Sequence, residues 1–282
     1  MKVLLKRYMK RNPFKKYFAF VKGGILQAFS YKFSIFGWIL GDFIQIIILC
    51  FLWIAIYQYS PTTEINGFTM PMMLTYLVSA RIVSQLVFSG DSFWQIGEDI
   101  RYGYIANNLI RPIDYRKRLM TMDIGNFFGI MIIAFIPIYI VSITVLHFAI
   151  GAMFPTWYNI IFFFISSLAS LLIISSFNFM IGQLAFFTGA LFGIGMIKNE
   201  LLMFLSGGYL PIAFFPEKLQ AILNILPFTS VLQTPNFILM GNYGITETII
   251  RILIQFGWAL VFSVLASLTF KGTIKHVTSV GG

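Results

Sequence analysis

The chain has 282 residues, of which 58% are hydrophobic and only 11% are charged, and 32 of them are phenylalanine. Soluble domains carry about 25% charged residues, and a soluble chain of this length has no interior able to hide so much apolar surface. The composition therefore excludes an ordinary soluble domain and indicates a membrane protein. The single cysteine, Cys50, excludes a disulfide framework and leaves the redox compartment open.

The segment 1–30 is rich in Lys and Arg and does not fit a secretory signal, because basic residues recur as far as Lys22 and no cleavage site follows an apolar core. Its apolar residues form two clusters at helical spacing. They are Leu4, Leu5 and Tyr8, then Phe14, Tyr17, Phe18 and Val21. Two interpretations stay open: an interfacial N-terminal helix on an anionic leaflet, or a solvated basic tail that sets orientation.

A membrane-spanning helix needs about 20 apolar residues. The apolar runs predict six such helices, at 33–59, 68–89 and 120–147, two within 159–210, and one at 249–270. The fourth and fifth share 159–210 with no hydrophilic loop between them, and we expect a break near Thr188 and Gly189. The expected fold is an all-α membrane protein, a single transmembrane domain over residues 1–282.

Positive residues predict the orientation of these helices. Nine Lys and Arg precede the first span, five lie in 101–118, and Lys271 and Lys275 follow the last span, whereas the loops 60–67 and 148–158 contain none. We therefore expect both termini in the cytoplasm, in a bacterial plasma membrane. The formal charge of +10 then reflects topology, with the lipid bilayer as a partner and no nucleic acid.

The segment 206–228 interrupts the external side after the fifth span. Its turn-forming residues are Gly207, Gly208, Pro211, Pro216 and Pro227. Pro216 and Glu217 suit the first turn of a helix that Pro227 stops. A helix this short does not span, so the segment either re-enters the membrane or lies in the outer interface, or it is a loop that follows the surface.

Charged residues inside predicted spans are costly and are functional candidates. Asp42 and Arg81 both fall roughly 12–14 Å deep from the cytoplasmic side, at about 1.5 Å per residue. Arg81 pairs with Asp42 or with Glu200, or it snorkels to the surface. Lys198 and Glu200 either face a polar vestibule or mark a later start of the fifth span, and Asn178 lies near the end of the fourth. Lys198 and Glu200, two residues apart, do not share a helical face.

The segment 93–118 concentrates charge before the third span. Phe93, Ile96, Ile100 and Tyr104 recur on one face and predict a helix over 93–109. The turn follows at Arg111 and Pro112, since residues before proline leave the helical region. Three basic residues then suit lipid phosphates. They are Arg116, Lys117 and Arg118. The mixed charges and tyrosines indicate either a docking surface or an interfacial helix with a solvated face.

Motifs for catalysis or nucleotide binding are missing from the sequence. No H-E-x-x-H, G-x-S-x-G, C-x-x-C or G-x-x-x-x-G-K-[ST] pattern occurs. The G-x-G-D pattern of intramembrane aspartyl proteases fails at Asp42 because Ile39 replaces its first glycine. We predict no catalytic or metal-binding residue and no cofactor on this chain.

Two motifs give the chain a family resemblance. Ile100 to Gly103 followed by Leu109 to Pro112 reads Ile-x-x-Gly and Leu-x-Arg-Pro, and 206–241 carries Ser-Gly, Pro, Phe-Phe-Pro and Leu-Pro-Phe in succession. With six predicted spans and a basic N-terminus, the whole chain resembles permease subunits of ABC exporters of the type 2 class. Ala106 departs from the pattern, since many relatives carry an acidic residue there, which affects the choice of partner.

The resemblance implies a cytoplasmic coupling helix in 93–118, seated in a separate ATPase subunit that binds ATP and Mg. The implied docking residues are Glu98, Asp99, Arg101, Tyr102, Gly103, Tyr104, Arg111 and Pro112. It also implies a second permease, the same or a related chain, and an external re-entrant hairpin in 206–228 that gates the pathway. The strongly apolar spans favour an amphipathic substrate, which is a drug, a peptide or a lipid-like molecule. The alternative is a membrane-embedded enzyme or assembly scaffold without transport activity.

Overall fold

The computed structural model describes residues 13–188 and 191–277, and these residues are almost entirely helical. The N-terminal half contains α2 (Pro13–Ser30), α3 (Lys32–Tyr59), β1 (Glu64–Ile65), β2 (Phe68–Thr69), α4 (Met70–Val87), α5 (Ser92–Arg101), α6 (Tyr104–Leu109), α7 (Tyr115–Ile130), the π-helical turn η1 (Met131–Phe135) and α8 (Ile136–Ile150). The C-terminal half contains α9 (Trp157–Gly182), the 3-10 turn η2 (Gln183–Phe186), α10 (Leu191–Leu205), the 3-10 turn η3 (Ile212–Phe214), α11 (Glu217–Ile225), α12 (Pro227–Val231), α13 (Gln233–Met240) and α14 (Ile245–Val277).

Helices long and apolar enough to cross a membrane number five in the described residues, which supports an all-α membrane protein. They are Ile39–Tyr59, Met70–Arg101, Tyr115–Ile150, Trp157–Phe186 and Ile245–Ile274. The predicted fifth span is α10, whose 15 residues fall short of the length of a span. Helix length therefore does not establish the predicted count of six. Thr188 is not helical, as predicted, and Gly189 lies outside the described residues.

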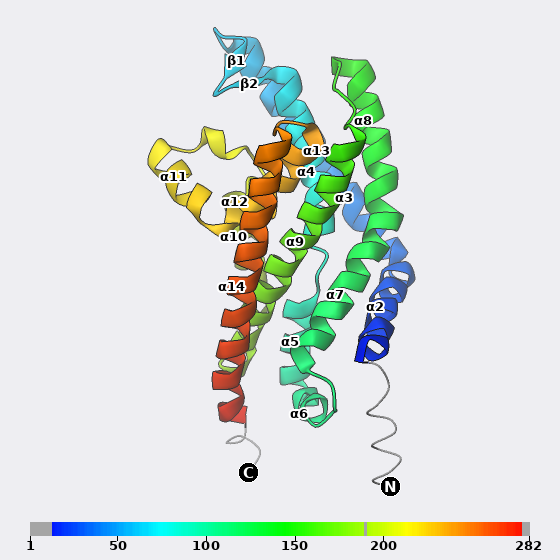
Figure 1. Ribbon diagram of the computed structural model, residues 1–282. Helices are drawn as coiled ribbons and strands as arrows, with labels where there is room; N and C mark the ends of the chain where they lie inside the picture. Colours follow the sequence, from blue (N-terminus) through cyan, green and yellow to red (C-terminus); the bar gives the residue numbers. More distant parts are fainter. Residues whose placement is uncertain (1–12, 189–190, 278–282) are drawn as a thin grey trace.

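Helix α9 runs through the middle of the bundle (Figure 1) and packs against α14, α13, α5 and α7. Its buried face carries small residues, including Ser166, Ser167, Ala169 and Ser170. Small side chains let helix backbones approach closely, which is the usual way membrane helices associate. The largest apolar cluster forms around this face, with Val83, Leu86 and Phe127 fully buried.

The two ends of the bundle differ in character. Helix α6, the start of α2 and the end of α14 lie at one end, and the β1–β2 hairpin and the end of α8 lie at the other (Figure 1). The hairpin turns at Asn66 and Gly67, which both have positive φ, as a tight two-residue connection requires. The described parts of the N- and C-terminal helices thus reach the same end as the predicted coupling segment.

Helix α2 packs along α7 at very close range. A Cβ atom on Gly24 would lie 2.2 Å from the carbonyl oxygen of Met122, and one on Gly125 would lie 2.0 Å from that of Val21. Residues 13–30 are therefore not a solvated tail, whereas their position at a membrane interface stays a prediction. Of the two apolar clusters predicted there, Leu4, Leu5 and Tyr8 lie outside the described residues.

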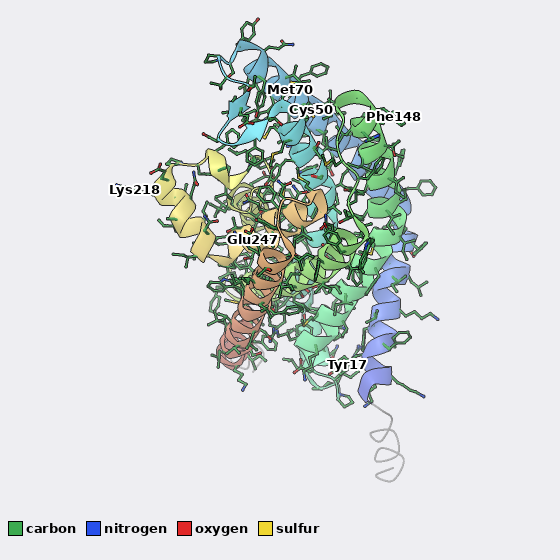
Figure 2. All side chains as sticks on the ribbon, turned by 45° about the horizontal axis from the view of Figure 1, so that its top comes forward. Tyr17, Cys50, Met70, Phe148, Lys218 and Glu247 are labelled. Atoms are coloured by element: carbon green, nitrogen blue, oxygen red, sulfur yellow. The ribbon has the colours of Figure 1, made fainter. Side chains whose placement is uncertain are left out.

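The segment 206–228 starts inside the bundle and then leaves it. The Tyr76 hydroxyl of α4 donates a 2.6 Å hydrogen bond to the Gly207 carbonyl oxygen, and the side-chain oxygen of Gln233 accepts one of 2.8 Å from the backbone N–H of Ile212. The predicted helix from Glu217 is α11, and it projects sideways with Lys218 at its edge (Figure 2). Helix α11 ends at Ile225, just before Pro227, and Pro227 also begins the next helix, α12.

Candidate functional site

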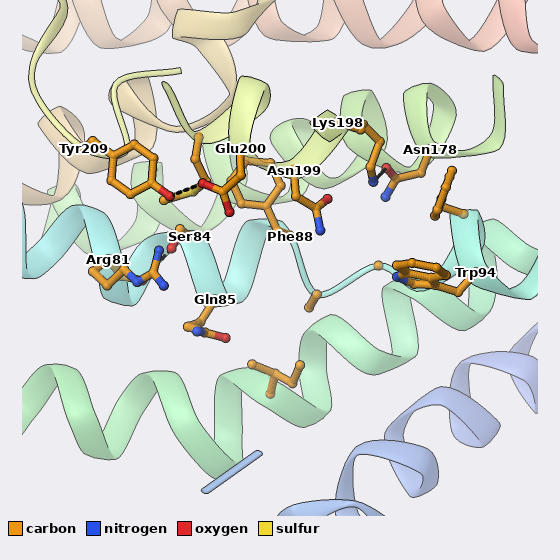
Figure 3. Close-up of a pocket in the computed structure, with 15 residues that line it drawn as sticks. Arg81, Ser84, Gln85, Phe88, Trp94, Asn178, Lys198, Asn199, Glu200 and Tyr209 are labelled. Atoms are coloured by element: carbon orange, nitrogen blue, oxygen red, sulfur yellow. Dashed lines mark hydrogen bonds between the residues drawn. The ribbon is translucent and has the colours of Figure 1, made fainter. Parts of the chain in front are cut away.

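A cavity of about 320 Å³ lies between α4, α5, α9 and α10. Figure 3 shows the polar side chains that point into it from these helices. Its lining residues are Arg81, Ser84, Gln85, Phe88, Ser89, Gly90, Phe93, Trp94, Ile130, Asn178, Lys198, Asn199, Glu200, Met203 and Tyr209. Four of the five polar residues predicted inside the membrane therefore meet in one place, although they come from three different helices.

The fifth predicted residue, Asp42, joins the cavity wall through Arg81. The guanidinium of Arg81 forms an ion pair with the Asp42 carboxylate, with Nε 2.8 Å from Oδ1. The side-chain amide of Gln85 donates to the other carboxylate oxygen. Of the two candidate partners, the structure thus pairs Arg81 with Asp42. Both side chains are largely buried, which makes a paired arrangement far less costly than two isolated charges.

Lys198 and Glu200 face different parts of the same cavity. The Lys198 ammonium donates a 2.6 Å hydrogen bond to Asn178 and lies 4.7 Å from the centre of the Phe93 ring. The Glu200 carboxylate accepts a hydrogen bond from the Tyr209 hydroxyl. No salt bridge joins Lys198 to Glu200 in the described residues, as their spacing predicted. The cavity therefore offers a cation and a carboxylate at separate positions.

The turn between α4 and α5 is held by Asp123 of α7, a role that the sequence did not suggest. The buried carboxylate of Asp123 accepts hydrogen bonds from the backbone N–H of Asp91 at 2.9 Å, from the Ser92 hydroxyl, and from the Ser175 hydroxyl at 2.6 Å. Asn126 donates to the Ser89 carbonyl oxygen at 2.5 Å. Residues 123 and 126 share a helical face. Their spacing was therefore the one feature of the sequence that could have predicted a shared contact.

Helices α5 and α6 form a corner, and the predicted continuous helix over 93–109 is wrong. Gly103 breaks it with φ of 73°, a left-handed conformation that glycine adopts without steric cost. Seven of the eight predicted docking residues are exposed at this corner or on the turn that follows. They are Glu98, Arg101, Tyr102, Gly103, Tyr104, Arg111 and Pro112. Ile110, which no sequence argument selected, is 83% exposed beside them.

Asp99, the eighth predicted docking residue, is buried inside the corner. Its carboxylate accepts hydrogen bonds from Asn108 at 2.9 Å and from the Tyr115 hydroxyl at 2.8 Å, and it forms a salt bridge of 3.1 Å with Arg118. The side chain is therefore not part of the exposed surface. It joins α5 to α6 and to the start of α7, because Asp99 lies on α5 and these partners lie on the other two helices.

Two of the three residues predicted to anchor lipid phosphates point into the protein. Arg118 pairs with Asp99, and Arg116 donates to the backbone oxygen and hydroxyl of Ser263 and to the hydroxyl of Ser267, at 2.5 to 2.9 Å. Only Lys117 of the three is exposed. Consecutive helical residues point about 100° apart, so three adjacent cations do not all face the lipid.

The predicted gate residues divide between a buried base and an exposed tip. Gly207, Gly208, Pro211 and Pro227 are buried, whereas Pro216 is exposed at the start of α11. A Cβ atom on Gly208 would lie 2.6 Å from the Met203 side chain, so the chain passes close to α10 here. The base of the segment thereby touches the helix that carries Lys198 and Glu200.

The comparisons with known proteins agree with this architecture. A search of curated proteins found no match. A sequence model of the ABC-2 family transporter proteins matches residues 43–281. The match includes the first membrane-crossing helix from Phe43 onward, the other four described membrane-crossing helices in full, and both motif regions. The resemblance found in the sequence is thereby confirmed. The chain therefore belongs to the ABC-2 family of transporter proteins, as a permease-type membrane subunit.

Proposed function

We propose that this chain is the membrane subunit of an ATP-driven exporter that moves an amphipathic substrate. The observation that carries the proposal is the position of α5, which presents Glu98 and Arg101 at an exposed corner and Phe93 and Trp94 to the polar cavity. One short helix thus joins a surface suited to a partner protein to a cavity suited to a cargo.

The exposed corner is the proposed docking surface for a separate ATP-binding subunit, which would hold ATP and Mg. Tyr102 and Tyr104 are 61% and 57% exposed, with their ring centres 5.9 Å apart, and Arg101 lies over the Tyr102 ring. Tyrosine and arginine are the residues that most often anchor protein interfaces. Such a dense exposed cluster of both kinds exceeds what a solvated charged face requires.

Movement of α5 would reach the cavity through α10. A Cβ atom on Gly195 would lie 2.7 Å from the Trp94 side chain, and one on Gly97 would lie 2.5 Å from the Leu191 side chain, so a side chain of each helix packs against a glycine of the other. The cavity wall on α10 carries Lys198 and Glu200. A closing motion of the ATPase subunits would thereby be converted into a change in the polar cavity, while Asp123 holds the other end of α5.

The proposed pathway forms between two permeases, the same or related chains. Helix α10 would be the sixth crossing despite its length, and it leaves apolar side chains such as Phe192, Met196 and Leu201 exposed for a second subunit. Both termini and the α5–α6 corner would then be cytoplasmic. The segment 206–228 would lie on the outer side and gate the exit.

Substitutions at the corner test this function. Arg101→Ala and Glu98→Ala should each weaken co-purification with the ATP-binding subunit. A residue that contributes about 1.4 kcal/mol to the binding free energy should lower the affinity roughly tenfold when it is removed. Both variants should still insert, because neither side chain supports the bundle. Lys218→Ala, an exposed charge on α11, is the control.

Full assembly of both corner variants with the ATP-binding subunit would exclude the α5–α6 corner as its docking surface. Purification of the native chain without any ATPase partner would instead favour a membrane-embedded enzyme or an assembly scaffold. Mass spectrometry of partner chains and of retained small molecules distinguishes these outcomes and reports the substrate class in the same experiment.

A further inference from the structure

A second cavity, of about 450 Å³, lies where the start of α7 meets the end of α14. It is separate from the polar cavity between α4 and α10, and no step of the proposed transport cycle uses it. Three cationic side chains line it: Arg116 and Lys117 from α7, and Lys271 from α14. Apolar side chains, including Phe270, complete its wall.

The charges in this cavity are unbalanced. Among the described residues that line it, Asp114 alone is acidic, and its carboxylate accepts a 2.8 Å hydrogen bond from the backbone N–H of Lys117 at the start of α7. In the part of the chain that the structure describes, none of the three cations forms a salt bridge. Arg116 is held in place by the hydroxyls of Ser176, Ser263 and Ser267, which carry no charge. An anion would therefore be attracted to the cavity.

The position of the cavity along the bundle identifies the kind of anion. Two membrane-crossing helices terminate there, one beginning at Tyr115 and the other ending at Ile274. Because the sequence predicts spans at 120–147 and 249–270, Lys117 and Lys271 would lie just outside the hydrocarbon, where lipid phosphates are concentrated. Basic pockets between membrane helices at this level are known to suit anionic headgroups.

The surface next to the cavity is suited to acyl chains. Leu260, Val264 and Leu268 are 67%, 49% and 59% exposed. They follow one another along α14 at helical spacing, on the side that continues to Lys271. A lipid whose phosphate reached Lys271 would lay its chains along this apolar strip, whereas free phosphate would gain nothing from it.

We infer that this cavity binds the headgroup of an anionic phospholipid from the leaflet nearest α6. Lys117 and Lys271 contact the phosphate, and Arg116 supplies positive charge from behind. The site adjoins Tyr115, whose hydroxyl bonds Asp99, so the bound lipid also braces the base of the α5–α6 corner. The inference does not depend on ATP or on a transported substrate.

Native mass spectrometry of the full chain in detergent tests the site. The chain is titrated with phosphatidylglycerol and, separately, with phosphatidylcholine of the same acyl chains. Phosphatidylglycerol should be retained preferentially and should raise the apparent melting temperature. Lys117→Ala/Lys271→Ala should weaken its binding by roughly 30-fold, since each surface lysine contributes about 1 kcal/mol toward anionic lipid.

The matched control is Lys218→Ala/Arg251→Ala, which removes two cations outside the cavity and the same net charge. This variant should bind phosphatidylglycerol as the native chain does. Equal loss in both double variants would show general electrostatic attraction and overturn the site. Equal binding of the two lipids would also overturn it, as would displacement of the lipid by millimolar inorganic phosphate, which would assign the cavity to a free anion.

Discussion

The hydroxyl of Tyr115, the first residue of α7, donates a 2.8 Å hydrogen bond to the carboxylate of Asp99 on α5. The two residues are 16 positions apart and belong to helices that meet at the α5–α6 corner. Arg118 adds a salt bridge to the same carboxylate. The corner is therefore fixed to the third membrane-crossing helix by one buried acid, and the exposed residues around it are presented on a rigid base.

Removal of this acid should destabilise the corner. Asp99→Ala leaves Arg118 largely buried without its partner, which costs about 3 kcal/mol, whereas Tyr115→Phe removes one hydrogen bond worth about 1 kcal/mol. The apparent melting temperature in detergent should fall in that order. Glu98→Ala, next to Asp99 but exposed, should change stability by no more than about 0.5 kcal/mol. Equal effects of Asp99→Ala and Glu98→Ala on stability would contradict the role of Asp99 in holding the corner to α7.

Adjacent glycines of α2 provide a matched pair of variants. Gly24→Ala should push α2 away from α7, because its Cβ atom would lie 2.2 Å from a backbone oxygen, whereas Gly23 has nothing within 4 Å. Overpacking of this kind costs about 1–3 kcal/mol. Gly23→Ala should stabilise the helix by up to about 1 kcal/mol. Protease accessibility of the N-terminal segment should rise only in Gly24→Ala, and a rise in neither variant would exclude the close packing.

The ion pair between Asp42 and Arg81 should appear as a coupling in a double-mutant cycle. Asp42→Asn and Arg81→Gln each leave one largely buried charge without its partner, so each alone should lower stability. The double variant should lose less than the sum, by an interaction energy of about 0.5–3 kcal/mol. Thermal unfolding of the four proteins measures this value, and strict additivity would show that the two charges do not interact.

Contact between α5 and α10 should be necessary for coupling but not for assembly. Gly195→Ala introduces a Cβ atom 2.7 Å from Trp94, whereas Gly193 of the same helix has open space around it. The Gly195→Ala complex should assemble with its ATPase, yet its ATP turnover should fall roughly twofold to thirtyfold, the range produced by coupling changes of about 0.5–2 kcal/mol. Gly193→Ala should turn over ATP normally. Unchanged turnover in both complexes would exclude transmission through this contact.

Several features follow from local sequence and were predicted from it. The long apolar runs of α3, α9 and α14 predict membrane-spanning helices directly, because hydrocarbon accepts only such segments. The helix from Glu217 follows from its proline start and helical spacing. Three charged residues were also recognised as functional candidates, because a charge inside an apolar span is energetically costly. They are Asp42, Arg81 and Lys198. Each of these conclusions needs only neighbouring residues.

The tertiary structure alone decided which side chains meet. Arg81 reaches Asp42 across 39 positions, Asp99 turns inward, and Asp123 holds a turn more than 30 positions away. In a soluble helix an apolar stripe marks the buried face. A membrane helix is apolar all round, so its sequence determines that it spans but not which face touches protein. Only the packing of small residues along α2, α7 and α9 settles that choice.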